Sequence, residues 1–326
     1  MKGIFVISID VEFGWGLVDV WDKVGEYESI RKEREAIRRV LEIFKGHGIR
    51  ATWAIVGHLF REVIEMREGR VVPEIPRPIM VGEKNDWFAA VGEGGEELWC
   101  ARDVVRMIRE AEPQQEIGSH SFGHLRYEEG VAHEEAIRAD IELARKVHEG
   151  EGVSFRVFVF PYNHVGFRRL LAEAGVRAYR GQTRRWYDGV KPYLLWRGLN
   201  LLTQLMGSTP PVVTPVRDEY GMVNVPDSML LYHRRGLRRL ITPRRQVEMA
   251  VRGMEAAARE GKIFHLWFHP SNIEYRMEEQ CRTLDEILCH ARRMIDDGVL
   301  ENMTIGEVAR TINNEEVVNG CARASN

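Results

Sequence analysis

Two short stretches, far apart in the sequence, carry side chains that together could hold a divalent metal ion. Asp10 and Glu12 follow the first apolar stretch, and His120 and His124 stand four residues apart much later in the chain. Two imidazoles and one carboxylate are a recurrent ligand set for catalytic Zn²⁺, and they leave positions for water and substrate. Fe²⁺, Co²⁺ and Mn²⁺ stay open as alternatives, because such ligands select weakly among these metals. The second carboxylate could take a proton from the metal's water.

Each half of this pattern also has an explanation without a metal. An acidic pair such as Asp10 and Glu12 more often caps a helix or forms salt bridges. Two histidines at a spacing of four also occur by chance. The metal site is therefore the favoured interpretation only if the fold brings both stretches together.

The elements around these residues alternate between strand and helix about seven times. The apolar patterns predict strands over 3–9, 50–56, 116–121, 155–160, 176–179, 222–225 and 262–268. They predict helices over 29–45, 58–67, 101–111, 134–148, 165–174, 243–259 and 276–296. This alternation is typical of parallel strands joined by helical crossovers. A closed or nearly closed α/β barrel fits one domain. An open doubly wound sheet is the alternative, but no GxGxxG follows the first strand to support a nucleotide site there.

The side chains that could do chemistry all follow predicted strands, at their carboxyl ends. They are Asp10, Glu12, His120, His124, Tyr162 and His269. In α/β barrels this rim holds the active site. His269 is a candidate general acid, since an imidazole can donate a proton near neutral pH. His265, on the same face of the last strand, is interpreted as a core histidine. Four histidines on or near helices are interpreted as surface residues: His47, His58, His133 and His148.

The composition of the chain limits its class. Its 326 residues are 44% hydrophobic and 29% charged, with a formal net charge of −3. This favours a globular protein with a sizeable core and argues against nucleic acid as the main partner. No apolar run is long enough to span a membrane, and no signal peptide precedes the first strand. The four cysteines form no CxxC pair, which is typical of free thiols in a reducing compartment, so we expect a cytoplasmic protein.

The organisation along the chain is that of one domain with an insertion. We expect a barrel over residues 1–312, interrupted by an irregular insert at about 69–97, and a flexible tail over 313–326. The insert is rich in proline and glycine and carries Trp87. Loops of this length inside compact domains are usually functional or disordered.

The segment Arg234–Arg245 holds six arginines with leucines and an isoleucine between them. A solvated helix face is the simpler interpretation of this run. The alternative is a docking surface for a phosphate, a lipid-linked sugar or an anionic membrane. Nothing in the sequence predicts the oligomeric state.

Four motifs, in order along residues 3 to 310, resemble those of the polysaccharide deacetylase family, which contains the NodB homology domain and carbohydrate esterase family 4. Ile9-Asp10-Val11-Glu12 resembles the first motif, D-x-E or D-x-D, and His120-Ser121-Phe122-Gly123-His124 closely resembles the second, H-[ST]-x-x-H. Phe160-Pro161-Tyr162 resembles the end of the third, and Leu266-Trp267-Phe268-His269-Pro270 the fifth. The resemblance implies a distorted (β/α)7 barrel, TIM-like and in a single domain.

The resemblance also implies a role for each matching residue. Asp10 resembles the catalytic base and His269 the catalytic acid. The backbone N–H of Tyr162 resembles part of the oxyanion hole. The residues that resemble the metal ligands are Glu12, His120 and His124.

The chain departs from the family pattern at several positions. Glu12 replaces the usual aspartate, and Val159 stands where the third motif has an arginine that orients the base. We predict that Arg180, after the fifth strand, orients Asp10 instead, and we place it among the substrate-site residues. No fourth motif is evident, and Trp186 is the candidate substitute.

Three tryptophans could stack on sugar rings at this rim, although a buried tryptophan is the usual case: Trp15, Trp87 and Trp186. With these departures, the motifs of this chain resemble those of enzymes of intracellular polysaccharide biosynthesis, or of the allantoinase-type branch, more than those of secreted chitin deacetylases. The resemblance implies a metal-dependent hydrolase that removes an N-acetyl group from an amino sugar of a polysaccharide or its lipid- or nucleotide-linked precursor. Hydrolysis of a small cyclic amide or ureide is the alternative within enzymes. A non-catalytic carbohydrate-binding barrel is the third possibility, and the presence of Asp10 and His269 argues against it.

Overall fold

The computed structural model describes residues 2–17, 27–67, 70–72, 91–92, 94–185 and 188–312. Its main element is one curled sheet in the order β10-β11-β1-β2-β5-β6-β7-β9-β8, with β12 also paired to β1. Paired strands of this sheet run parallel except β8 and β9, which are antiparallel. The curled sheet forms a half-barrel in a single domain. The strand bounds are β1 Gly3–Val11, β2 Thr52–Ile55, β5 Glu116–Ser119, β6 Val157–Val159, β7 Ala178–Arg180, β8 Val216–Arg217, β9 Val223–Asn224, β10 Met229–Leu230, β11 Ile263–Phe268 and β12 Leu300–Asn302.

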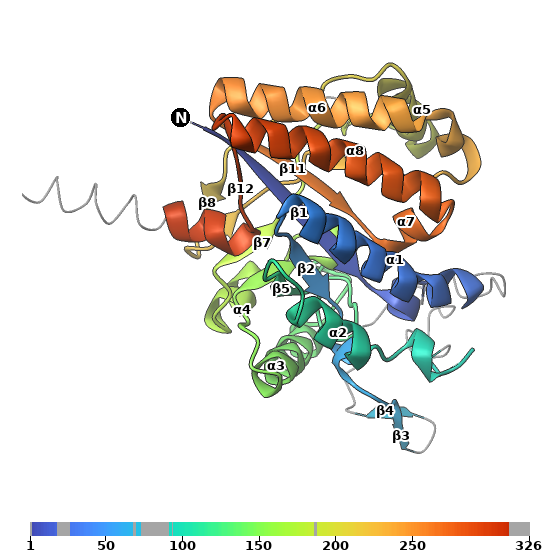
Figure 1. The fold of residues 1–326 in the computed structure, drawn as a ribbon. Coiled ribbons are helices and arrows are strands. Elements are labelled where there is room, and N and C mark those ends of the chain that lie inside the picture. Colours follow the sequence, from blue (N-terminus) through green and yellow to red (C-terminus); the bar gives the residue numbers. More distant parts are fainter. Residues whose placement is uncertain are drawn as a thin grey trace, which may run out of the picture.

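Helices cover the outside of the curled sheet. Their bounds are α1 Tyr27–His47, α2 Arg102–Arg109, α3 Glu134–Gly150, α4 Arg168–Glu173, α5 Tyr193–Leu205, α6 Pro243–Glu260, α7 Pro270–Glu274 and α8 Met277–Asp296. Helices α6, α8 and α1 lie side by side over one half of the sheet, and α2, α3 and α4 lie over the other half (Figure 1). The predicted apolar face of α1 is confirmed, because Ile30, Ile37, Val40, Leu41 and Phe44 are buried. No described helix is long and apolar enough to cross a membrane.

Strand β1 lies at the centre of the sheet and sets the direction of the reactive side chains. Its Phe5, Ile7 and Ile9 belong to the larger core under the helices, whereas Val6 belongs to a smaller core on the other face. Because side chains alternate along a strand, Ser8 and Asp10 continue the row that Val6 begins. The strand therefore packs at its amino end and presents polar groups at its carboxyl end.

Side-chain caps stabilise the starts of two helices. Helix α6 begins at Pro243, as predicted, and the hydroxyl of Thr242 accepts the Arg245 N–H at 3.2 Å. A capping box precedes the last described helix, at 305–312. The Glu307 N–H donates to Thr304 Oγ1 at 3.3 Å, and the Thr304 N–H donates to Glu307 Oε2 at 3.0 Å. These side chains satisfy amides that the helix itself leaves unpaired.

The helix predicted over 58–67 is wrong. The chain forms a short 3₁₀ turn, Gly57–Phe60, and then the two-stranded β3 Glu65–Arg67 and β4 Arg70–Val72. The N–H groups of Gly57 and His58 donate to the carbonyls of Ser121 and Phe122 instead of propagating a helix. A pairing between segments this far apart cannot be read from a local apolar pattern.

Two histidines predicted at the surface are buried. His58 is 1% exposed and lies between the rings of Trp15 and Phe122. His148 is fully buried, donates from Nδ1 to the Ala144 carbonyl at 2.8 Å and packs against Phe60. Burial lowers the pKa of His148 to about 4. These histidines therefore belong to the core as neutral rings, whereas the prediction for His265 as a core histidine is confirmed.

We expect His148 to make the protein acid-sensitive. Because its pKa is lower in the folded chain than in the unfolded one, the unfolded state binds the extra proton, and stability is lost as the pH falls from about 6.5 to about 4. This contribution amounts to about 1.4 kcal/mol per pH unit within that window. Urea unfolding of His148→Gln between pH 4 and 7 should give a shallower pH dependence than wild type. The exposed His133→Gln is the matched control and should keep the wild-type slope; equal slopes in all three proteins would contradict the prediction.

Candidate active site and metal centre

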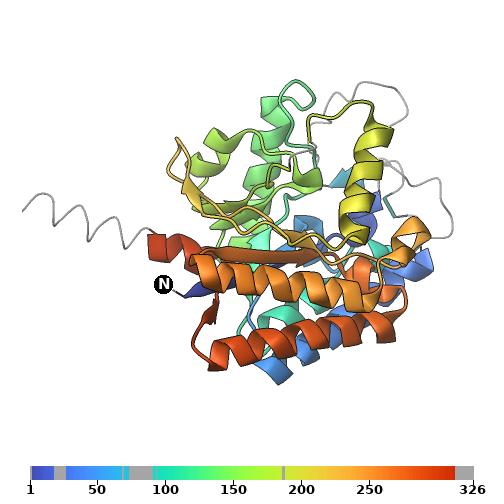
Figure 2. The same cartoon turned by 90° about the horizontal axis from the view of Figure 1, so that it is seen from above.

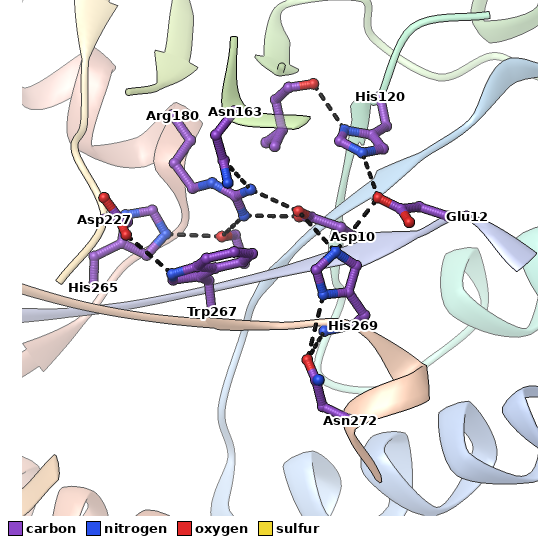
Figure 3. Close-up of polar contacts among 12 residues, drawn as sticks. Asp10, Glu12, His120, Asn163, Arg180, Asp227, His265, Trp267, His269 and Asn272 are labelled. Carbon is purple, nitrogen blue, oxygen red and sulfur yellow. Dashed lines mark hydrogen bonds and ion pairs between the residues drawn. The ribbon is translucent and has the colours of Figure 1, made fainter. Parts of the chain in front are cut away.

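Asp10 is held by a buried arginine from the opposite part of the sheet. Arg180, at the end of β7, donates to both carboxylate oxygens of Asp10, at 2.7 and 2.6 Å (Figure 3). The same guanidinium donates to Ser8 Oγ and to Asn163 Oδ1, both at 3.0 Å. Its centre also lies 4.4 Å from the centroid of the Trp267 ring. A planar guanidinium with acceptors at both ends and an aromatic face on its side has little freedom to move.

Arg180 therefore contacts Asp10 as expected, and its role in orienting the base in place of the third-motif arginine stays a prediction. Arg180 is only 1% exposed, and its placement among the substrate-site residues stays a prediction. Val159 serves through its backbone, since its carbonyl accepts a hydrogen bond from His120 Nδ1 at 2.8 Å. Burial alone would raise the pKa of Asp10, but Arg180, His120 and His269 together outweigh burial and keep that pKa below its ordinary value.

Glu12 meets both histidines of the second motif. Its Oε1 lies 2.9 Å from His120 Nε2 and 3.2 Å from His124 Nε2. Burial raises the pKa of Glu12, but the nearby histidines reverse this effect and hold it well below the usual value. The two stretches that the sequence analysis paired are therefore together in the fold.

The donor set fits a divalent metal ion. The ligand atoms of Glu12, His120 and His124 all lie within 4.8 Å of one another. The Val159 carbonyl can only accept, so His120 carries its proton on Nδ1 and turns Nε2 toward Glu12, as metal-binding histidines do. A second group, of Asp10, Glu12 and His269, is equally compact. We favour the first group, because both oxygens of Asp10 are already engaged by Arg180.

The loop that carries the two histidines is anchored by Asp140 of α3, which sequence reasoning missed. Asp140 is fully buried and accepts the N–H groups of Phe122 and Gly123 at 3.0 and 2.8 Å, and the Tyr127 hydroxyl at 2.7 Å. Its partners hold a loop in which Ser121 and His124 have positive φ of 68° and 56°. A signal was available, because Asp140 is an acid on the apolar face of its predicted helix.

His269 approaches the two carboxylates from β11. Its Nε2 lies 3.4 Å from Glu12 Oε1 and 3.8 Å from Asp10 Oδ2 (Figure 3). Asn272 fixes its other side, because the side-chain Oδ1 of Asn272 accepts the backbone N–H of His269 at 2.8 Å and lies 3.3 Å from His269 Nδ1. Burial lowers the pKa of His269, but Glu12 and Asp10 outweigh it and raise that pKa to about 9. The ring therefore carries a proton at neutral pH.

The other predicted contacts with substrate have mixed outcomes. Tyr162 lies in a left-handed backbone conformation, φ 55°, with its ring 4.7 Å from the ring of His124. Trp15 is fully buried, stacks on His58 and donates from Nε1 to the Trp99 carbonyl at 3.0 Å, so its contact with a sugar ring stays a prediction. Trp87 and Trp186 lie outside the described residues.

The arginines of Arg234–Arg245 are largely paired within the chain. Arg234 contacts Glu279 at 2.9 Å, Arg235 contacts Glu274 at 2.5 Å, and Arg244 contacts Glu248 at 2.8 Å. Arg234 is itself buried, so the run is not one solvated helix face. Docking to a membrane or lipid-linked sugar through this segment stays a prediction. Fewer of its arginines are available to an external anion than the sequence indicates, because several are paired with carboxylates of the chain.

Comparisons with known proteins show the fold. No family model matches the chain, and no curated protein matches its sequence. A candidate polysaccharide deacetylase from Mycobacterium smegmatis has a similar structure, with a TM-score of 0.65 and 15% identity, over 97% of this chain and 92% of that one. A probable polysaccharide deacetylase from Pseudomonas aeruginosa PAO1 gives a TM-score of 0.59 at 13% identity, over 94% and 89%. The structure of Puue allantoinase is also similar, with a TM-score of 0.58 and 14% identity, over 94% of this chain and 89% of that one. The chain therefore has the NodB-type fold of the polysaccharide deacetylases, a distorted barrel in one domain.

Proposed function

We propose that the protein is a metal-dependent hydrolase that removes an N-acetyl group from an amino sugar. One observation carries this proposal: a carboxylate held by Arg180, a protonated His269 and a Glu12–His120–His124 cluster converge on one buried spot. Amide hydrolysis needs a base for the water, an acid for the leaving nitrogen and a means to stabilise negative charge on oxygen. The site has separate groups for the first two.

Glu12, His120 and His124 would hold the metal. When bound, a divalent cation in such a site lowers the pKa of its water and polarises a substrate carbonyl. Zn²⁺ is the proposed ion, with Fe²⁺, Co²⁺ and Mn²⁺ as alternatives.

Asp10 would act as the base. Arg180 keeps its carboxylate ionised at neutral pH and points one edge of it toward His269 and the metal ligands. A carboxylate with a lowered pKa is a weak base, so it can take a proton only from a water that is already acidified. This requirement explains why an arginine-bound aspartate stands beside a metal site.

His269 would act as the acid. Its ring is protonated at neutral pH, and Asn272 holds it in a fixed orientation. An amide nitrogen leaves poorly without a proton, so His269 would donate one to it as the C–N bond breaks. The backbone N–H of Tyr162 is proposed to donate to the developing oxyanion, as the family resemblance implies. The cytoplasmic location remains a prediction from the sequence.

Hydrolysis of a small cyclic amide is the second candidate, because the fold of Puue allantoinase is also similar. Acetate release from N-acetylated mono- and oligosaccharides, compared with hydrolysis of allantoin, separates the two. Release of acetate supports the deacetylase. Turnover of allantoin alone favours the second candidate, and tight binding of saccharide with no turnover of either supports the non-catalytic barrel.

We expect His120→Ala and His124→Ala each to lose most of the bound metal. Each replacement removes one of three protein ligands, and both imidazoles are buried with Nε2 toward Glu12. Metal content after equilibrium dialysis, measured by elemental analysis, tests this. The exposed His133→Ala is the control and should bind metal as wild type does. Wild-type metal content in both site variants would contradict the assignment of the ligands.

A further inference from the structure

A cavity of about 280 Å³ lies beside the proposed active site, underneath α5. Both ribbon views place α5 at the end of the molecule toward which β11 runs (Figures 1 and 2), and His269 directly follows that strand. The polar residues that define the cavity are Arg184, Arg185, Asn200, Gln204, Ser228 and Tyr232. Its apolar wall includes Pro210, Met229 and Met249. The volume suits a group the size of a substituted monosaccharide rather than a long polymer.

The charged side chains that line the cavity are positive. They are two guanidinium groups, and the described lining residues include no aspartate or glutamate, although Asp188 next to the cavity accepts the Arg185 backbone N–H at 2.5 Å. Arg184 is exposed, and no described carboxylate lies within ion-pair distance of it. Arg185 is held in place, since its Nη1 donates to Asn200 Oδ1 at 3.0 Å. An anionic group is therefore the complementary ligand.

The inner face of α5 is built for polar contacts. Gln204, which is 4% exposed, donates from Nε2 to the same Asn200 oxygen at 2.6 Å, so the floor of the cavity is a fixed network. The helix leaves Leu195, Leu202 and Met206 exposed on a different face. Asn200 and Gln204, one turn apart on α5, therefore present polar groups to the cavity.

A short chain of contacts links the cavity to Asp10. The backbone N–H of His265 donates to the hydroxyl of the cavity residue Ser228 at 3.1 Å. The neighbouring Asp227 accepts from Trp267 Nε1 at 3.1 Å, and Trp267 packs on Arg180, which holds Asp10. The cavity and the proposed catalytic site therefore share supporting side chains.

We propose that this cavity binds the phosphate of a phosphorylated amino sugar, so that the substrate is a sugar phosphate ester or diphosphate rather than a neutral polysaccharide. This inference rests on the proposed deacetylase function and specifies its substrate class. Guanidinium groups match phosphate oxygens in geometry and charge, and their charge does not titrate at physiological pH. The hydroxyl and amide groups of Ser228 and Asn200 supply neutral donors, and the methionines face the apolar side of a sugar or carrier group.

Binding to the metal-loaded protein tests the proposal without requiring turnover. Isothermal titration calorimetry would compare N-acetylglucosamine, N-acetylglucosamine 1-phosphate and inorganic phosphate. We expect the sugar phosphate to bind at least tenfold more tightly than the neutral sugar or phosphate alone. Arg184→Gln should remove most of this advantage. Arg259→Gln, at an exposed position on α6, has the same change in charge and should keep it.

Each outcome decides one part of the proposal. Equal affinity for the neutral and phosphorylated sugars overturns it, and so does an undiminished advantage in Arg184→Gln. Inorganic phosphate that binds as tightly as the sugar phosphate shows a site for a free anion and overturns the substrate assignment. Binding that depends on Arg184, without any acetate release, supports the phosphate site and contradicts the deacetylase function. Where acetate is released, the ratio of kcat/KM for the phosphorylated sugar to kcat/KM for the neutral sugar should fall about tenfold in Arg184→Gln. A change of this size corresponds to the loss of one charge-assisted hydrogen bond.

Discussion

Asp10→Asn is expected to lower turnover by about 10²–10⁴-fold while the protein keeps its metal and its fold, with reduced stability because Arg180 stays buried without a carboxylate partner. The asparagine has the same shape as the aspartate but cannot take a proton from water. Its carbonyl oxygen can still accept from one arm of Arg180, which also retains Ser8 and Asn163 as acceptors. Acetate release and metal content, measured on the same samples, test this expectation.

His269→Ala is the matched comparison for Asp10→Asn. It should lose turnover to a similar extent and also retain the metal, because neither residue belongs to the proposed ligand set. If Asp10→Asn loses the metal, Asp10 is a ligand and the roles of the two carboxylates are wrongly divided. If His269→Ala keeps near-normal turnover with every substrate tested, the leaving nitrogen receives its proton from another group.

Arg180→Met is expected to destabilise the protein by about 3–5 kcal/mol, because it leaves the Asp10 carboxylate buried without its partner. Both side chains of this pair are almost fully buried, at 1% and 3% exposed. Urea unfolding at pH 7 measures the loss. Without Arg180, burial would raise the pKa of Asp10, so turnover should fall as well.

The double variant Asp10→Asn/Arg180→Met separates the charge effect from the loss of packing. It should recover much of the stability lost in Arg180→Met, because it contains no unpaired buried charge. If the double variant is as unstable as Arg180→Met, the loss comes from the contact between Arg180 and Trp267 or from the cavity left behind. A change in stability below about 1 kcal/mol in Arg180→Met would show that the pair holds little of the fold.

The sequence predicted which side chains lie together where the position of a side chain depends only on the strand that it ends or follows. Alternation along β1 places Ser8 and Asp10 on one face, and the ends of β5 and β11 bring His120 and His269 to the same rim. The contact of Arg180 with Asp10 was predictable for a similar reason, since Arg180 follows a predicted strand and Val159 cannot supply a guanidinium.

The sequence predicted less where a contact joins distant segments. Nothing local shows that residues 57 and 58 bond to the loop of the second motif, so the 3₁₀ turn there was missed. The strands β8, β9 and β10 have two residues each, too few for a recognisable period, and only β9 was predicted. The burial of His58 and His148 depends on aromatic rings from other elements, which no pattern within their own segments indicates.

Acetate release as a function of metal content is the measurement that would decide the proposed function. The protein would be stripped with a chelator, dialysed and titrated with Zn²⁺, while acetate release from an N-acetylated amino sugar is followed. We predict no release from the stripped protein and a linear recovery that ends at one ion per chain, with no recovery in His120→Ala. Undiminished release after metal removal, or no release from protein that holds one ion per chain with any N-acetylated sugar, would contradict a metal-dependent deacetylase.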